Sequence, residues 1–379
     1  MRQLTYVKKD TLQWWDVKDP ELQSPKDAIV RPIAAARCDG DKVFLFNNIT
    51  KPIQAGLALH YLDPVAIDVL GKNPYQGPLA VGHEGIAEVV SCGEEVSAFK
   101  RGDKVIVPWA ISCGSCFNCK SGLTSKCSDA GDTYLSAYGF GQAMGPWGGM
   151  VSDFVRVPFA DSMLVAVPEG IDPVSLASAS DNIPDGWRTV APFLKKRPEA
   201  PVLIVGGAAE SIGLYAAGIA VALGSSKVDY MDYLKPRLDI AEALGANPIE
   251  IPKQRRAAWY RKQAPRRNGD YPISVDASAN PDGLRFAIRS LAPGGFCTSV
   301  GYYFQKGVSI PLMQMYANCS TLHTGISHPR ADLPELLELI KSNKFQPAKI
   351  TTVLSNWEDA HEAFLERTTK VIVHRPSIF

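Results

Sequence analysis

Four cysteines that lie close together in the chain could hold a metal ion. They are Cys113, Cys116, Cys119 and Cys127, with the spacing C-x2-C-x2-C-x7-C. In a reducing compartment this spacing is typical of a metal site rather than of disulfides. Four thiolates suit tetrahedral Zn²⁺ and leave no coordination position for a substrate, so the predicted site is structural. Four unrelated thiols and an iron–sulfur cluster are the alternatives, although the spacing fits neither ferredoxin pattern well.

A glycine-rich segment, residues 206–213 with the sequence GGAAESIG, could bind the phosphates of a dinucleotide. It follows a strand-like apolar run at 202–205 and leads into a helix-like run at 211–223. Glycines let the backbone approach a pyrophosphate, and a helix start offers free N–H groups. The predicted cofactor contacts are Gly206, Gly207, Ser211, Ile212 and Gly213. Because the spacing departs from G-x-G-x-x-G, a glycine turn in a sheet without a cofactor is the alternative.

Asp232 is the residue predicted to select the cofactor. It ends the strand-like run 227–232, which follows the glycine-rich segment after one predicted helix. A carboxylate at this position can accept hydrogen bonds from the ribose hydroxyls of adenosine, and it would repel a 2′-phosphate. The sequence therefore favours NAD(H) over NADP(H).

The elements that must position these residues fall into two regions. Up to about residue 165, short apolar runs such as 28–30, 86–90 and 104–107 lie between turn residues, which indicates a β-rich domain. From about residue 170, strand-like and helix-like runs alternate, which indicates a parallel sheet covered by helices. Further predicted elements are the strands 273–276 and 296–300 and the helix 236–244. The predicted domains are 1–168 together with 309–379, and 169–308 for the dinucleotide-binding domain.

Composition excludes several classes of protein. The 379 residues include 40 Lys and Arg against 39 Asp and Glu, and 46% are hydrophobic, which is typical of a globular chain and not of a disordered one. The near-zero net charge argues against a protein that mainly binds nucleic acid or an anionic membrane. No apolar run approaches the roughly 20 residues of a membrane helix, and the start of the chain lacks a secretory signal, so we expect a cytoplasmic protein. Seven basic residues between 253 and 267 are interpreted as a solvated helix and loop.

Several motifs taken in order resemble a known family. They are Cys38, Gly82-His83-Glu84, Gly102-Asp103-Lys104-Val105, the four-cysteine segment and the later nucleotide-binding pattern. This order is similar to that of the zinc-dependent medium-chain alcohol dehydrogenases. The resemblance implies an α/β fold, with a GroES-like β-rich catalytic domain and a doubly wound parallel-sheet (Rossmann) cofactor domain. The segments 148–161 and 180–184 look most similar to the formaldehyde dehydrogenase and aldehyde dismutase branch.

The resemblance also implies a second, catalytic zinc. A lone cysteine and a lone histidine are by themselves more typical of structural positions, but the family places Cys38, His83 and Asp181 on one zinc with an open fourth position. Zinc there would activate an alcohol or a carbonyl for hydride exchange with nicotinamide. The family further implies that Asp41 orients the His83 ring, that Glu84 lies close to the metal, that Trp109 walls the substrate pocket and that Lys370 lies near the cofactor phosphates.

The sequence departs from the family at its proton relay. Gly40 stands where relatives carry Ser or Thr, and Val43 stands where some carry a relay histidine. Either water, Asp39 or a residue from elsewhere then moves the proton, or the reaction does not need the usual alkoxide step. The extra stretch 48–77, which contains His60, is expected to reshape the substrate entrance.

The expected function is a zinc- and NAD-dependent oxidoreductase acting on an alcohol/aldehyde or alcohol/ketone pair. A conjugate C=C reductase and a non-catalytic nucleotide- or nucleic-acid-binding module are the alternatives. The expected partners are a small-molecule substrate and further copies of the chain, as a homodimer or homotetramer by resemblance, with no nucleic acid and no membrane.

Overall fold

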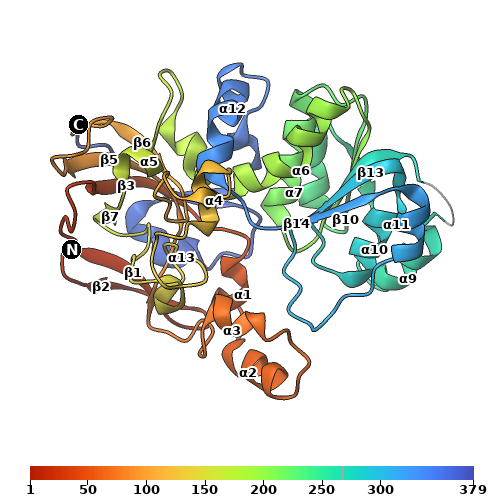
Figure 1. Ribbon diagram of the computed structural model, residues 1–379, viewed down its shortest axis with the longest axis horizontal. Coiled ribbons are helices and arrows are strands. Elements are labelled where there is room, and N and C mark those ends of the chain that lie inside the picture. Colours follow the sequence, from red (N-terminus) through yellow and green to blue (C-terminus); the bar gives the residue numbers. More distant parts are fainter. Residues whose placement is uncertain (266–268) are drawn as a thin grey trace. The chain divides into compact units, whose positions relative to one another are not determined.

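The computed structural model describes residues 1–265 and 269–379, and Figure 1 shows its helices and strands. The chain divides into two compact units: Met1–Pro184 with His328–Leu337 and Thr351–Phe379, and Asp185–Ser327 with Glu338–Ile350. The predicted boundaries at 168/169 and 308/309 lie earlier in the chain. Residues 309–327 belong to the second unit because β14 (Thr321–Thr324) pairs in parallel with β13 (Leu291–Ser299).

The first unit is rich in β-structure, as predicted. Its larger sheet contains β3 (Ala28–Ala36), β5 (Glu84–Cys92), β6 (Lys104–Val107), β7 (Val155–Val157), β8 (Val165–Ala166), β15 (Val353–Asn356) and β16 (Val371–His374). The order is β15-β16-β3-β5-β6-β8, with β7 paired to β3. A second sheet has the order β2 (Thr11–Asp16), β1 (Arg2–Lys8), β4 (Leu79–Ala80). The pairing that matters for the site is that of β3 with β5, which is antiparallel and sets Ala36 opposite Glu84.

Short helices connect these strands. They are α1 (Asp41–Leu45), α2 (Thr50–Ala58), α3 (Val65–Leu70), α4 (Phe117–Lys120), α5 (Ala160–Met163) and α13 (Ala360–Ala363), with 3₁₀ turns at η1 (Thr124–Lys126), η2 (Gly141–Met144), η3 (Pro173–Ser180) and η5 (Trp357–Asp359). Helices α2 and α3 form within the extra stretch 48–77.

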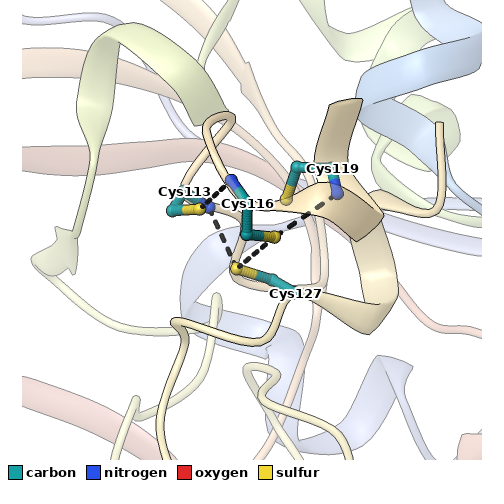
Figure 2. A group of neighbouring side chains, drawn as sticks. All are labelled: Cys113, Cys116, Cys119 and Cys127. Carbon is teal, nitrogen blue, oxygen red and sulfur yellow. Dashed lines mark hydrogen bonds between the residues drawn. The ribbon is translucent and has the colours of Figure 1, made fainter. Parts of the chain in front are cut away.

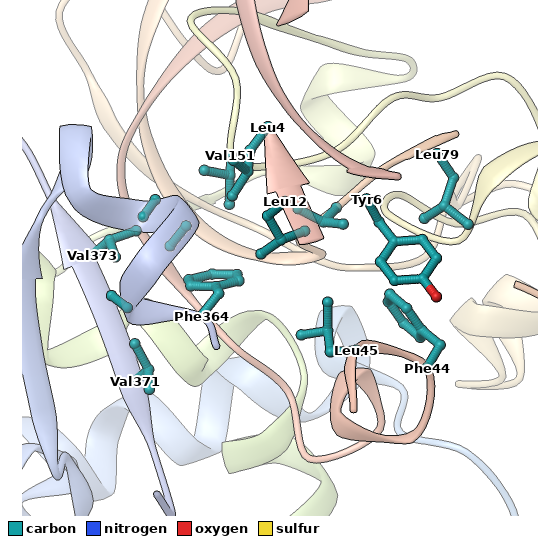
Figure 3. Close-up of a cluster of buried hydrophobic side chains, with 14 of the residues drawn as sticks. Leu4, Tyr6, Leu12, Phe44, Leu45, Leu79, Val151, Phe364, Val371 and Val373 are labelled. Carbon is teal, nitrogen blue, oxygen red and sulfur yellow. The ribbon is translucent and has the colours of Figure 1, made fainter. Parts of the chain in front are cut away.

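Helix α1 is anchored in a hydrophobic core that Figure 3 shows. Phe44 and Leu45 are each 1% exposed, and the ring of Tyr6 meets Phe44 edge-on at 5.1 Å. Phe364 packs in the same cluster, from the far end of the chain. Burial of a large apolar side chain stabilises a fold by about 1.5–3 kcal/mol, so this core fixes the segment that directly follows Cys38.

The second unit has a parallel sheet, as predicted. Its strands are β9 (Val202–Val205), β10 (Val228–Asp232), β11 (Asn247–Glu250), β12 (Tyr271–Asp276), β13 and β14, in the order β11-β10-β9-β12-β13-β14. Its helices are α7 (Glu210–Ala222), α8 (Lys235–Ala243), α9 (Arg256–Gln263), α10 (Pro281–Arg289) and α11 (Leu312–Asn318), with a 3₁₀ turn at η4 (Pro347–Ile350). Helices α6 (Asn182–Lys196) and α12 (Pro329–Lys341) have residues in both units. The strand order reverses at β9, where doubly wound sheets bind dinucleotides.

The basic stretch 253–267 is partly helical, because α9 carries its central residues; Arg266 and Arg267 lie outside the described residues. Across the part of the chain that the structure describes, no helix combines the length and the apolar character needed to cross a membrane.

Candidate metal centre and cofactor site

Three side chains from separate segments meet in the first unit. Cys38 lies just after β3 and His83 directly before β5, so the pairing of Ala36 with Glu84 brings them together. Asp181 directly follows η3, and its Oδ2 lies 3.4 Å from Cys38 Sγ and 3.4 Å from His83 Nε2. One ligand atom from each of the three lies within 4.8 Å of the others.

The electrostatics of this cluster fit a bound cation. Burial, reinforced by Asp181 and Glu84, raises the pKa of the Cys38 thiol well above its ordinary value. Burial alone would lower the pKa of His83, but Asp41 and Asp181 raise it to about 9. Several carboxylates lie close to a buried thiol and a buried imidazole here. A divalent cation bound between them would compensate the negative charge of these carboxylates. Sulfur, nitrogen and oxygen donors in this number suit zinc.

Asp41 lies next to His83, and its predicted role in orienting the imidazole stays a prediction. Its Oδ1 lies 3.5 Å from His83 Nδ1, and its Oδ2 accepts a hydrogen bond of 3.1 Å from the backbone N–H of Cys38. Burial raises the pKa of Asp41, and the neighbouring His83 opposes that effect. A carboxylate near Nδ1 would favour the tautomer whose Nε2 can bind a metal, which is how ligand histidines are usually held.

Glu84 and Lys370 form a fully buried ion pair beside the cluster. Lys370 Nζ lies 2.6 Å from Glu84 Oε2, and both side chains are 0% exposed. Burial raises the pKa of Glu84 to about 7, with Lys370 opposing the rise. The other two donors of the ammonium go to Asn182 Oδ1 at 2.8 Å and to the carbonyl of Arg37 at 3.1 Å. The contact of Lys370 with cofactor phosphates stays a prediction, and these three acceptors argue against it.

Two aromatic rings lie against His83. Phe140 stacks on its imidazole with ring centroids 4.5 Å apart, and the buried Trp109 lies edge-on at 6.4 Å. Trp109 thus lies next to the cluster, and its role as a wall of the substrate pocket stays a prediction. Phe140 was not singled out from the sequence, because no local pattern marks a ring that reaches His83 from a distant part of the chain.

The extra stretch 48–77 lines a cavity of about 720 Å³ in the first unit. Tyr75 and Phe140 are among its lining residues, together with the glycine-rich loop 141–148. His60 is exposed and follows the end of α2.

At the relay position, the backbone N–H of Gly40 donates to Cys38 Sγ at 3.3 Å. Asp39 is 6% exposed and its Oδ1 lies 3.7 Å from Lys42 Nζ.

The four-cysteine cluster is shown in Figure 2. One sulfur from each cysteine lies within 4.8 Å of the others, and the sulfurs of Cys116 and Cys127 are 3.9 Å apart. None of the four is in a disulfide. Backbone N–H groups donate to the sulfurs: Cys116 N to Cys113 Sγ and Cys113 N to Cys127 Sγ, both at 3.3 Å. This closed set of sulfur donors fits a structural zinc.

The glycine-rich segment follows β9 and leads into α7, as predicted. A Cβ on Gly207 would lie 2.6 Å from the backbone of Ser278, and one on Gly206 would lie 2.7 Å from Asp232 Oδ2. A Cβ on Gly213 would meet Ala277 at 3.2 Å. Ser211 and Ile212 are buried in the first turn of α7. Close packing of these positions against neighbouring backbone and side-chain atoms therefore explains why glycines stand here.

Asp232 ends β10 and is fully buried. Its Oδ1 accepts hydrogen bonds from the backbone of Tyr233 at 2.6 Å and from Arg237 at 2.9 Å, and its Oδ2 accepts from the Tyr230 hydroxyl at 3.1 Å. Arg237 also donates to the carbonyl of Gly207 at 2.9 Å. Arg237 was not predicted from the sequence, although a basic residue shortly after the strand-ending aspartate is a usable signal. The ribose contact of Asp232 stays a prediction.

Comparison with known proteins agrees with this arrangement. Residues 24–169 match the alcohol dehydrogenase GroES-like domain, and residues 211–342 match the zinc-binding dehydrogenase family. A probable zinc-binding alcohol dehydrogenase of Mycobacterium tuberculosis is 26% identical over 91% of this chain and 80% of its own length. A glutathione-independent formaldehyde dehydrogenase of Bacillus subtilis is 35% identical over 50% of this chain and 46% of its own.

The fold comparison points the same way. An alcohol dehydrogenase from Thermus sp. ATN1 superimposes with a TM-score of 0.80 at 25% identity, covering 99% of both chains. Fold and matched domains together define a zinc-type dehydrogenase. The chain belongs to the zinc-dependent medium-chain alcohol dehydrogenase family, and it is an alcohol or aldehyde oxidoreductase.

Proposed function

We propose that this enzyme transfers a hydride between NAD(H) and an alcohol/aldehyde or alcohol/ketone pair at a zinc held by Cys38, His83 and Asp181. The observation that carries the proposal is the convergence of these three donors to within 4.8 Å from three distant segments. Three protein ligands leave one of the four positions of tetrahedral zinc for substrate. When bound, zinc supplies Lewis-acid activation of the alcohol or carbonyl oxygen.

The residues of the chain have separate tasks in this proposal. Asp41 holds the imidazole of His83 so that Nε2 faces the cluster. The buried ion pair of Glu84 and Lys370 fixes the protein interior behind the three ligands. Trp109 and Phe140 contact the imidazole and would exclude water from its surroundings. With Gly40 and Val43 at the relay positions, the buried carboxylate of Asp39, the residue after Cys38, is the proposed proton acceptor.

The cofactor is proposed to be NAD(H), bound at the segment 206–213. The turn between β9 and α7 at the reversal of strand order supports this position. The carboxylate of Asp232 at the end of β10 is the group on which the choice of NAD over NADP is proposed to depend, and its charge is paired with Arg237 at 2.9 Å. Lys370 is the least supported of the predicted cofactor contacts, because its donors are already satisfied.

The partial match to a glutathione-independent formaldehyde dehydrogenase supports small aldehydes and short alcohols as the first substrates to test. A homodimer or homotetramer and a cytoplasmic location complete the proposal. Light scattering after size-exclusion chromatography measures the oligomeric state, and imaging of a tagged chain measures the cellular location.

The test is a screen for NADH formation over a panel of alcohols, with zinc content measured on the same samples. The proposal predicts about two zinc ions per chain, one for each donor cluster, and alcohol-dependent NADH formation. Cys38→Ser is expected to lose one zinc and the activity, whereas Cys92→Ser, a half-buried cysteine outside both clusters, is expected to keep both. One zinc per chain, located in the four-cysteine cluster, would contradict the proposal.

The same samples separate the two alternatives. Saturated aldehydes formed from enals, without alcohol oxidation, would show a conjugate C=C reductase. Salt-sensitive binding of nucleic acid, with no activity that depends on Cys38, would show a binding module.

A further inference from the structure

Asn182, the residue after Asp181, contacts two of the three proposed zinc ligands. Its side-chain Nδ2 lies 3.1 Å from Cys38 Sγ and 3.0 Å from Asp181 Oδ2. Its Oδ1 accepts a hydrogen bond of 2.8 Å from Lys370 Nζ. The residue is 0% exposed. One buried carboxamide thus links a buried cation to both anionic ligands.

The orientation of this amide follows from the chemistry of its neighbours. An ammonium has only donors, so the group that faces Lys370 must be the amide oxygen. The NH₂ group must then face Cys38 and Asp181, which are acceptors when they bind a metal. Lys370 is itself fixed, because Glu84 Oε2 and the carbonyl of Arg37 take its remaining donors at 2.6 and 3.1 Å. Nothing in this chain of contacts permits the opposite orientation without placing N–H groups against an ammonium.

The backbone of Asn182 closes the network. Its N–H donates to Glu84 Oε1 at 2.9 Å, while Glu84 Oε2 pairs with Lys370. Ser178 adds a donor to the same carboxylate at 3.2 Å. Asn182 is therefore held at both its backbone and its side chain, in the first turn of α6, directly beside the ligand Asp181.

We infer that Asn182 is a positioning residue for the catalytic metal: it orients the thiolate of Cys38 and the carboxylate of Asp181 by donating a hydrogen bond to each. The inference rests on the proposed function. Donated hydrogen bonds draw negative charge from a thiolate and a carboxylate, so the metal stays more electrophilic toward the substrate oxygen. They also keep both ligands from turning away while the fourth position is exchanged.

The test measures the metal directly, with Co²⁺ in place of zinc. The absorption band of thiolate bound to cobalt reports on Cys38 once the spectrum of Cys38→Ser, which keeps only the four-cysteine cluster, is subtracted. Competition with a chelator gives the affinity of the same site. Loss of such a supporting contact typically weakens metal binding or activity by about 10- to 100-fold.

Asn182→Ala is expected to shift the cobalt–thiolate band and to weaken metal binding by about 10- to 100-fold. Asn182→Asp keeps the size of the side chain and an oxygen for Lys370, but it presents a second oxygen to two anionic ligands. We expect it to weaken metal binding at least as strongly, which keeps the test available if the alanine variant does not fold. Asn318→Ala is the matched control: Asn318 is also buried and donates to the carbonyl of Leu291 at 2.9 Å, but it lies in the second unit.

The outcomes separate this inference from the proposed function. A shifted band and weaker binding in both Asn182 variants, with Asn318→Ala unchanged, support the positioning role. If the wild type holds metal in both clusters, and both Asn182→Ala and Asn182→Asp match its cobalt–thiolate band and its metal affinity, the positioning role of Asn182 is overturned. The proposed function is then unaffected. Metal confined to the four-cysteine cluster of the wild type overturns the proposed function and this inference together.

Discussion

Replacing Lys370 by methionine distinguishes two roles for this lysine. The family resemblance places it near the cofactor phosphates, whereas the structure pairs it with Glu84 at 2.6 Å, with both side chains 0% exposed. Removal of one partner from a buried ion pair costs about 3–5 kcal/mol, because the other charge is left uncompensated. Asn182 Oδ1 and the carbonyl of Arg37 would lose a donor as well. We therefore expect Lys370→Met to lower the free energy of unfolding by at least about 3 kcal/mol.

Denaturant unfolding of the zinc-loaded chain, followed by tryptophan fluorescence, measures this loss. The double variant Lys370→Met/Glu84→Gln removes both charges and should recover about 0.5–3 kcal/mol relative to the sum of the single variants. Lys100→Met, at an exposed position, is the control and should stay within about 0.5 kcal/mol of the wild type. In parallel, the Kd for NADH is measured by fluorescence. A stability close to that of the wild type, combined with a clearly raised Kd, would refute the ion-pair reasoning and support the phosphate contact.

Three further predictions follow from single contacts. Gly207→Ala should destabilise the chain by about 1–3 kcal/mol and weaken NADH binding, since its Cβ would lie 2.6 Å from the backbone of Ser278; an unchanged melting temperature would contradict this. Asp41→Asn should lower the zinc affinity of the Cys38 cluster about 10- to 100-fold in chelator competition, and equal affinities would show that His83 needs no carboxylate. Burial raises the pKa of Asp229. The hydrogen bonds that its carboxylate accepts from Lys227, Tyr271 and Asn247 outweigh this effect, so the pKa is lowered overall. Asp229→Asn should therefore lower the free energy of unfolding by its largest amount at pH values above the ordinary pKa of 3.8. The difference from the wild type should shrink as the pH falls through the lowered pKa that Asp229 has in the native state. Unfolding of wild type and variant across the acidic pH range measures it, and a difference independent of pH would contradict the reasoning.

The four-cysteine cluster was predictable because its geometry is local. All four ligands lie in the single short segment from Cys113 to Cys127, so the spacing alone limits how the chain can fold around an ion. The alternation of strand and helix in the second unit was equally local, and β9, α7 and β10 begin and end within a residue of the predicted runs.

The Cys38 cluster was predictable only through the family resemblance. Cys38 and His83 lie far apart in the sequence, and the register of β3 against β5, which no local pattern reveals, brings them together. The contacts of Asn182 and Phe140 with the ligands could not be predicted from the sequence for the same reason: they arise from tertiary packing. The second unit extends past the predicted boundary at 308/309 because β14 continues its parallel sheet beyond residue 308.

The central claim is that Cys38, His83 and Asp181 hold one metal ion. Anomalous diffraction at the zinc absorption edge, from crystals of the purified chain, tests it most directly. The account predicts two peaks, one bonded to Cys38 Sγ, His83 Nε2 and an Asp181 carboxylate oxygen, and one among the four sulfurs of the cysteine cluster. A single peak, confined to the cysteine cluster, would contradict it.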